Sequence, residues 1–90
     1  MIERKAFPHR SLYEIAAEIR RDWKDPKTGK SKIYFGAVPY LDAMCSLDQV
    51  SENYGCDSGK SVVLYFLANA NTWRGDVAKR VKAELKAITK

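Results

Sequence analysis

An unbroken apolar run at residues 62–67, Val-Val-Leu-Tyr-Phe-Leu, constrains the fold of this chain more than any other part of its sequence. No side of this run is polar, whether it forms a strand or a helix, so the segment has to be hidden from water. Six residues would suit a strand, but the alanine-containing residues that follow lengthen the segment and favour a helix. We therefore predict a buried central helix over residues 59–70, capped by Asp57 or Ser58.

Two amphipathic segments are predicted to pack on this helix. Ser11 and Glu14 form a capping box, and apolar residues recur behind them at helical spacing through residues 11–24. Residues 73–88 place apolar side chains on one side and lysines on the other, with Thr72 as the predicted cap. Each segment therefore predicts a helix with one face against a core.

The stretch between the first helix and the central one allows more than one assignment. Residues 33–38 could be helical or extended. Pro39 is tolerated in a first helical turn, which predicts either a helix over about residues 38–46 or one that starts earlier and is kinked at Pro39. Ser46 could cap a further short helix that ends at Gly55, because glycine readily takes the left-handed conformation at a helix end.

Together these segments indicate an all-α fold. Ninety residues suit one domain, and no internal repeat is visible. We expect a compact single-domain bundle of four to five helices around the central apolar helix, spanning residues 11–90. Residues 1–10, which contain a proline, are expected to form a flexible N-terminal lead.

The charge is distributed unevenly along the chain. Sixteen lysines and arginines stand against eleven acidic residues, a net charge of +5. Residues 1–32 carry nine basic and five acidic side chains, residues 33–59 four acidic and no lysine or arginine, and residues 60–90 seven basic and two acidic. An acidic middle between basic ends favours self-association or an anionic partner, and it excludes an acidic mimic of DNA.

Several classes of protein find no support in the sequence. No apolar stretch approaches the ~20 residues that span a bilayer, and no signal peptide is visible, so we expect a cytoplasmic protein without membrane contact. Cys45 and Cys56 are expected to be reduced, buried packing residues. With His9 as the single histidine, we predict no metal site, no Cys–His nucleophile pair, no cofactor and no catalytic residues.

Residues 55–61, Gly-Cys-Asp-Ser-Gly-Lys-Ser, approach the pattern of a phosphate-binding loop. The motif needs four residues between its first glycine and the Gly-Lys-Ser, and this chain has three. A helix cap explains the residues better, although a weak anion site beside Lys60 stays open. A small nucleotide-binding protein or enzyme centred on Lys60 is thus the third and least supported hypothesis.

Three stretches carry a resemblance: residues 34–44, residues 61–75 and the Ile-Arg-Arg-Asp-Trp of residues 19–23. They resemble small uncharacterised proteins of bacterial phages, plasmids and integrative elements. The resemblance implies a cytosolic bacterial protein carried on mobile DNA. It transfers no catalytic or binding residue to this chain.

Two binding hypotheses remain. In the first, a non-enzymatic accessory protein of a mobile element binds nucleic acid without sequence readout, neutralising phosphates with cations of the last helix. These cations are Arg74, Lys79, Arg80, Lys82 and Lys86. A merely solvated helix face explains the same residues. In the alternative, a modulator of a host or phage protein, such as a defence or replication factor, uses the aromatic and acidic region 34–57 through Tyr34, Phe35 and Tyr40.

Overall fold

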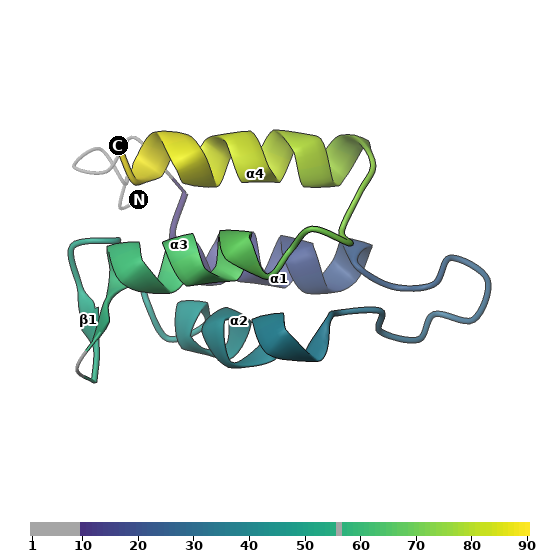
Figure 1. Cartoon of the computed structure of the whole chain (residues 1–90), viewed down its shortest axis with the longest axis horizontal. Helices are drawn as coiled ribbons and strands as arrows, with labels where there is room; N and C mark the ends of the chain where they lie inside the picture. The colour runs from purple at the N-terminus through teal and green to yellow at the C-terminus, as the bar shows by residue number, and fades with distance from the viewer. Residues whose placement is uncertain (1–9, 56) are drawn as a thin grey trace, which may run out of the picture.

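A computed structural model describes residues 10–55 and 57–90 (Figure 1). Within them the chain is mostly helical, with one small sheet and one short 3₁₀ turn. In chain order the elements are α1 (Leu12–Asp22), η1 (Phe35–Ala37), α2 (Val38–Met44), β1 (Asn53–Tyr54), β2 (Asp57–Ser58), α3 (Gly59–Ala68) and α4 (Asp76–Ile88). The predicted flexible lead lies outside the described residues apart from Arg10.

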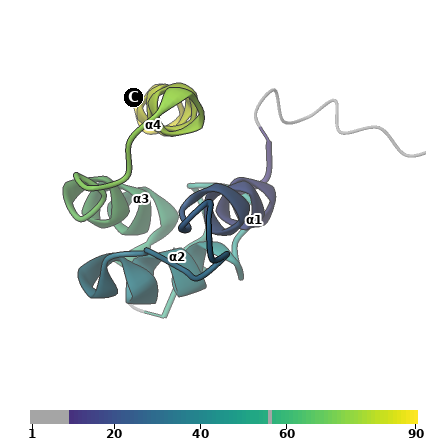
Figure 2. The ribbon, with the colours of Figure 1, turned by 90° about the vertical axis from the view of Figure 1, so that its right-hand side faces the viewer.

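The helices form three layers around one core. Figure 2 shows α1 and α3 side by side in the middle layer, with α4 on one side of them and α2 on the other. The side chains between the layers are apolar and fully buried, so every helix contributes one face to the same core. The largest of them are Leu12, Ile15, Ile19, Leu41, Met44, Val62, Val63, Phe66, Trp73, Val81 and Leu85.

The first helix begins as its sequence predicts. The capping box of Ser11 and Glu14 is present, and the Ser11 N–H donates to Glu14 Oε1 at 3.0 Å. The next two N–H groups, which no helical carbonyl can reach, donate to the carbonyl oxygens of Asp48 and Leu47 at 2.9 and 3.0 Å. The helix ends at Asp22 rather than at the predicted residue 24, because Trp23 leaves the helical conformation and turns into the core.

The prediction of a strictly all-α chain is wrong in the segment before α3. Strands β1 and β2 pair in antiparallel register, with Asn53 opposite Ser58 and Tyr54 opposite Asp57. Gly55, at φ +62°, makes the turn between the strands instead of ending a helix. The short helix predicted to begin at Ser46 does not form. The residues after α2 make turns instead, and carbonyl oxygens of these turns accept hydrogen bonds from the first N–H groups of α3.

The apolar run does form a helix, but α3 is not a central helix buried on all sides. Val62, Val63 and Phe66 are buried, whereas Leu64 is 46% exposed and Tyr65 is 50% exposed. The helix packs against α2, α4 and the hairpin of β1 and β2, and α1 lies beside it in the middle layer (Figure 2). A helix in such a layer keeps one side open to solvent whatever its sequence.

The last helix begins three residues later than predicted. Its cap is Gly75, at φ +113°, and not Thr72. Trp73 is a buried side chain on the connection rather than part of the helix. The connection crosses from α3 in the middle layer to α4 in the neighbouring outer layer, and it needs these residues to span the distance (Figure 1).

Residues 33–38, which the sequence left open between helical and extended, begin as extended chain and then become helical. Ile33 and Tyr34 lie outside any helix, then η1 leads directly into α2. Pro39 lies in the first turn of α2, as predicted, and the helix ends at Met44 rather than at residue 46.

Candidate nucleic-acid interface

Trp73 fixes the connection between α3 and α4 to the core. Its indole stacks on Trp23 with ring centroids 5.7 Å apart and meets Phe66 edge-on at 6.5 Å. Its Nε1–H donates to Asp22 Oδ2 at 2.9 Å, so the polar atom of this buried ring has a partner. Because Trp73 is anchored in the core, the residues on either side of it are held in fixed positions at the surface.

A hollow of about 300 Å³ lies against this support at the start of α4. Its lining residues are Trp73, Arg74, Gly75, Ala78, Lys79 and Lys82. Within residues 10–55 and 57–90, no carboxylate forms an ion pair with Arg74, Lys79 or Lys82. The hollow therefore has three uncompensated positive charges, and it suits an anion.

Lys82 is the least exposed of these three cations. Its Nζ donates to the carbonyl oxygen of Trp73 at 2.6 Å and lies 5.9 Å from the centroid of the Trp73 ring. Burial lowers the pKa of Lys82, and the positive charges of Arg74 and Lys86 lower it further. A bound anion would relieve this repulsion, because a negative charge close to an ammonium group favours its protonated form.

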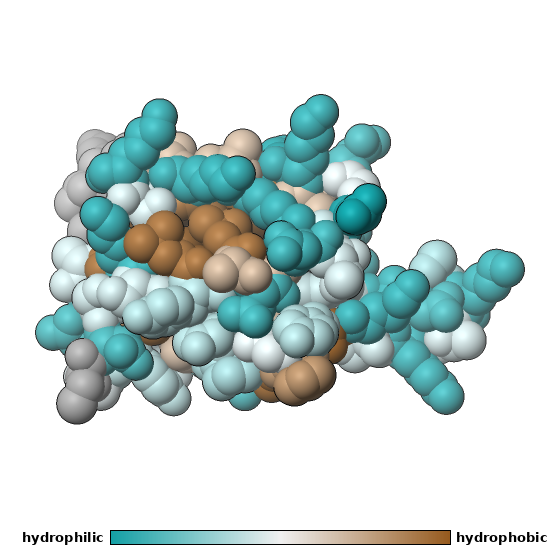
Figure 3. Space-filling model, viewed as in Figure 1, coloured by the Kyte–Doolittle hydropathy of each residue, from teal (hydrophilic) through white to brown (hydrophobic). Residues whose placement is uncertain are grey.

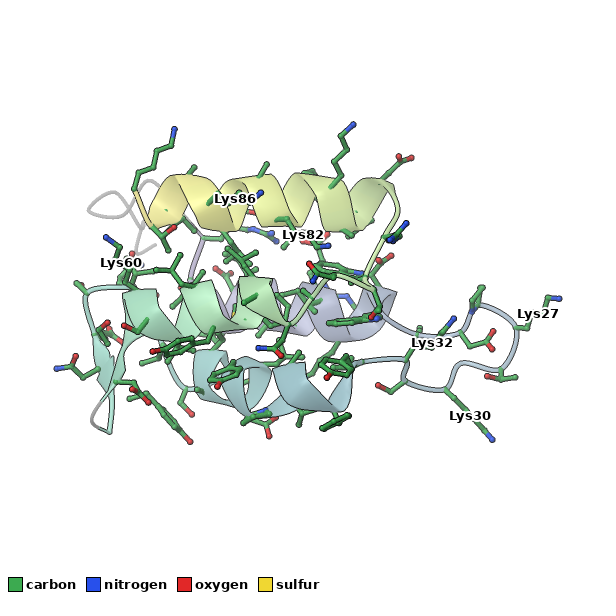
Figure 4. The ribbon with its side chains drawn as sticks, viewed as in Figure 1. Lys27, Lys30, Lys32, Lys60, Lys82 and Lys86 are labelled. Carbon is green, nitrogen blue, oxygen red and sulfur yellow. The ribbon has the colours of Figure 1, made fainter. Side chains whose placement is uncertain are left out.

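The structure brings four of the five predicted cations together and separates the fifth. Lys79, Lys82 and Lys86 are three and four residues apart, so they share one stripe of α4, and Arg74 precedes the helix. Figure 4 shows Lys82 and Lys86 on the same side of α4. Arg80 instead forms an ion pair with a carboxylate of α1, so its charge is already compensated.

Arg80 belongs to an ion-pair network that joins α4 to α1. Arg10 donates to both carboxylate oxygens of Glu84, at 3.0 and 2.7 Å, and also lies 2.8 Å from Glu18. The hydrogen bond from Arg80 lowers the pKa of Glu18, burial opposes it, and the hydrogen bond from Arg10 lowers the pKa further. These cations hold the fold together, and we do not count them in the interface.

Further positive charge lies on the loop between α1 and η1. The loop carries four lysines: Lys24, Lys27, Lys30 and Lys32. An antiparallel bridge between Lys24 and Ser31 closes it, and the Asp25 N–H donates to the Lys30 carbonyl at 2.8 Å. Figure 1 shows the loop projecting from the end of the molecule at which α4 begins, and Figure 4 marks three of its lysines. The loop therefore extends the positive surface beyond the hollow.

The three aromatic residues predicted for a protein interface have different surroundings. Phe35 is 80% exposed, and its ring centroid lies 4.7 Å from that of Tyr34, which is also exposed. Tyr40 is half-buried, and its ring packs 5.4 Å from that of Tyr65 on α3. Tyr34 and Phe35 are thus available to a partner, whereas Tyr40 joins α2 to α3.

A second hollow, of about 260 Å³, lies at the residues just before Trp73. Its lining residues are Tyr34, Ala68, Asn69, Asn71 and Thr72. The Asn69 Nδ2 donates to the Tyr65 carbonyl at 2.9 Å. Asn71 and Thr72 are exposed, and their side chains have no hydrogen-bond partner in the part of the chain that the structure describes. The sequence indicated Thr72 only as a helix cap and did not single out Asn71, so their role as the wall of a hollow was missed.

The start of α3 does not form the anion site that residues 55–61 left open. The N–H groups of Gly59 and Lys60 donate to carbonyl oxygens of the preceding turn, at 2.6 and 3.1 Å. The Ser61 N–H donates to the hydroxyl of Ser58, the predicted cap, at 3.1 Å. Because the chain itself occupies these three donors, they cannot hold a phosphate.

Cys45 is an exposed free thiol, so the prediction of a buried packing residue is wrong for this cysteine. It follows the last residue of α2, where Met44 and Leu47 take the core positions on either side. Cys56 and His9 lie outside the described residues. Among the described residues, no three histidine, cysteine, aspartate or glutamate side chains gather closely enough to hold a metal ion.

The sequence also failed to indicate an apolar strip on α3. Leu64 is exposed, and the half-buried Leu67 follows one turn later on the same side. Figure 3 shows apolar surface between α3 and α4 with hydrophilic side chains around it, and Figure 4 places Lys60, Lys82 and Lys86 on this face. An unbroken apolar run does not indicate which of its sides faces solvent, so periodicity could not have revealed the strip.

No helix in the described part of the chain combines the length and the apolar character needed to cross a bilayer. Comparisons with family models, with curated proteins and with solved structures returned no match for this chain.

Proposed function

We propose that this chain is a non-enzymatic protein that binds nucleic acid through its phosphates, without reading the base sequence. One observation carries the proposal: Arg74, Lys79 and Lys82 converge on a single hollow and have no ion-pair partner among the described residues. Cations on a fixed support can neutralise phosphates and release the counterions condensed on a nucleic acid. Lys86, one turn further along α4, extends the same contact.

The resemblance to small proteins of bacterial mobile elements suggests where nucleic-acid binding would take place. A protein of a bacterial phage, plasmid or integrative element would serve as an accessory to the handling of mobile DNA. This origin stays a prediction from the resemblance alone.

The strength of binding should depend steeply on salt. Neutralising about four phosphates of a duplex gives a log–log slope near −3.6, which weakens binding roughly 150-fold between ~50 and ~200 mM salt. Fluorescence anisotropy with labelled duplex DNA over this range measures the slope.

Two double variants that each lose two positive charges test whether the salt dependence comes from the cations of the hollow at Trp73. Arg74→Ala with Lys79→Ala removes two cations of the hollow whose side chains form no hydrogen bond or ion pair among the described residues, and it should reduce the slope by about 1.8. Arg21→Ala with Lys60→Ala removes two exposed cations that do not line the hollow and should leave the slope nearly unchanged. Equal effects of the two double variants, or no binding by the wild type at low salt, would refute the proposed surface.

A second candidate function rests on the apolar strip of Leu64 and Leu67. An exposed leucine beside Lys60, Lys82 and Lys86 suits an amphipathic helix of a partner protein with acidic residues along its edges. This candidate keeps the class of the earlier alternative, a protein-binding modulator, but moves its surface from region 34–57 to α3. It becomes the leading function if DNA does not bind and a labelled acidic amphipathic peptide binds the wild type but not Leu64→Gln.

A further inference from the structure

The hollow beside Tyr34 has the lining that an unpaired nucleobase needs. One wall is the aromatic ring of Tyr34, and the polar part of the lining is two amide side chains and one hydroxyl. Bases that are not paired are bound by stacking on aromatic rings and by hydrogen bonds to their edges. Amides supply both donors and acceptors, so they can meet more than one kind of base edge.

The size of the hollow limits what it can hold. Its volume of about 260 Å³ lies just below the ~300–1,000 Å³ of typical small-molecule pockets. It therefore suits one small planar ring rather than a larger ligand. Asn71 and Thr72 keep their side-chain hydrogen-bonding groups available for that ring, since they have no partner among the described residues.

The place of the Tyr34 ring depends on the absence of a side chain at Gly36. A Cβ atom at Gly36 would lie 2.6 Å from Tyr34 Cε2 and 2.8 Å from Asn69 Oδ1, so only glycine leaves room for this arrangement. Phe35 lies next to Tyr34 and is exposed, which offers a second ring for a neighbouring base.

The hollow beside Tyr34 and the hollow lined by Arg74, Lys79 and Lys82 are formed in part by residues that lie close together in the chain. Thr72 lines the first and Arg74 lines the second, and Cα atoms two residues apart lie within about 7 Å. On its other side, Tyr34 follows Lys30 and Lys32 of the projecting loop (Figure 4). A single strand could thus place a base against Tyr34 and its phosphates against cations on both sides.

We propose that the hollow of Tyr34, Asn69, Asn71 and Thr72 holds an unpaired nucleobase of a single strand whose phosphates contact Arg74 and Lys79. The proposal rests on the nucleic-acid function proposed above and narrows it to single strands. A base in a duplex cannot enter, because its faces are stacked and its hydrogen-bonding edge is paired. The protein therefore binds single-stranded nucleic acid more tightly than duplex at equal salt.

Tyr34→Leu and Asn71→Ala test the hollow against a matched control, Tyr54→Leu. Tyr54 is exposed to the same degree as Tyr34 but lies on β1, away from both hollows. Anisotropy is measured with single-stranded oligothymidylate, with a duplex of the same length and with free thymidine monophosphate. Tyr34→Leu should weaken single-strand binding about 5- to 150-fold, the loss expected for one stacked base, and should leave duplex binding unchanged.

The outcomes separate the two proposals. The proposed base site would be refuted if the wild type bound single strand and duplex equally well. It would also be refuted if Tyr34→Leu and Asn71→Ala both left single-strand binding intact. In either case the phosphate-binding function would stand. Failure of the wild type to bind either oligonucleotide would refute the function itself. Thymidine monophosphate that binds as tightly as the strand would refute the strand as the source of the base. Asn71→Ala removes no described contact, so it tests the hollow even if Tyr34→Leu does not fold.

Discussion

At the scale of single residues, the two hollows depend on aromatic side chains, Trp73 and Tyr34, whose places are set by close neighbours. Trp73 is fixed by the hydrogen bond to Asp22 and by its stacking on Trp23. The ring of Tyr34 occupies the space that Gly36 leaves open. Each of these neighbours can be altered without touching the cations that would bind phosphate.

Gly36→Ala should weaken single-strand binding without changing duplex binding. The added Cβ would overlap the Tyr34 ring and the Asn69 amide, so the ring has to leave its place as a wall of the hollow. Because Tyr34 is exposed and can move, the cost in folding free energy should be near the lower end for overpacking, about 1 kcal/mol. Anisotropy with both oligonucleotides and a thermal melt measure the two effects. Unchanged single-strand affinity, where Tyr34→Leu reduces it, would contradict the role given to Gly36.

At the scale of secondary-structure elements, helices differ in how far their own sequence specifies them. The capping box and the apolar stripe of α1 predicted that helix within two residues, and the amphipathic pattern predicted α4 from Asp76 onward. Trp73 has the spacing of the α4 stripe but packs from the connection. A buried indole needs a partner for its N–H, and that partner, Asp22, comes from another helix.

The contact between α1 and α4 should make stability depend on pH in the acidic range. The pKa of Glu18 is lowered from its ordinary value of 4.5, so the unfolded chain binds a proton at a higher pH than the folded chain does. The stabilisation is therefore complete above pH 4.5 and is lost as the pH falls through and below that value. Glu18→Gln should cost about 1–2 kcal/mol at neutral pH, and less as the solution becomes acidic. Urea unfolding of both proteins across this range measures the difference, and a difference that does not vary with pH would contradict the assignment.

At the scale of the whole molecule, one core joins all three layers. Trp23 and Trp73 are stacked at its end, and the buried side chains of every helix meet in it. The positive charge is distributed unevenly over the surface around this core. The three cations of the hollow at Trp73 and the lysines of the loop lie toward the end of the molecule at which α4 begins, whereas the hairpin of β1 and β2 lies at the opposite end (Figure 1).

Because the core is shared, the chain should unfold in a single cooperative transition. Far-UV circular dichroism reports the helices, and tryptophan fluorescence reports the contact between α1 and the α4 connection. The two should give the same midpoint, as small single domains usually do. Leu85→Ala, which opens a cavity under α4, should lower the free energy of unfolding by about 2–5 kcal/mol and shift both midpoints together. A fluorescence change that precedes the loss of helix would show that α4 separates on its own.

The sequence by itself determined the helical character of the chain, the two amphipathic helices, the place of Pro39 and the choice of Asp57 or Ser58 as the cap of α3, because these depend on local spacing and on neighbouring residues. It also identified the cations of α4 as candidates. The tertiary structure decided which of them face solvent together. Arg80 is drawn to Glu18, whereas Arg74, Lys79 and Lys82 meet around Trp73.

Tertiary structure alone also decided the hairpin, the open side of α3 and the hollow that joins Tyr34 to Asn71 and Thr72. The strands pair residues on either side of a turn, and the hollow brings together segments more than thirty residues apart. Which side of an apolar helix stays exposed depends on how many helices pack against it. No local pattern reveals the open side of α3 or the hollow, since both arise only when distant segments share one core.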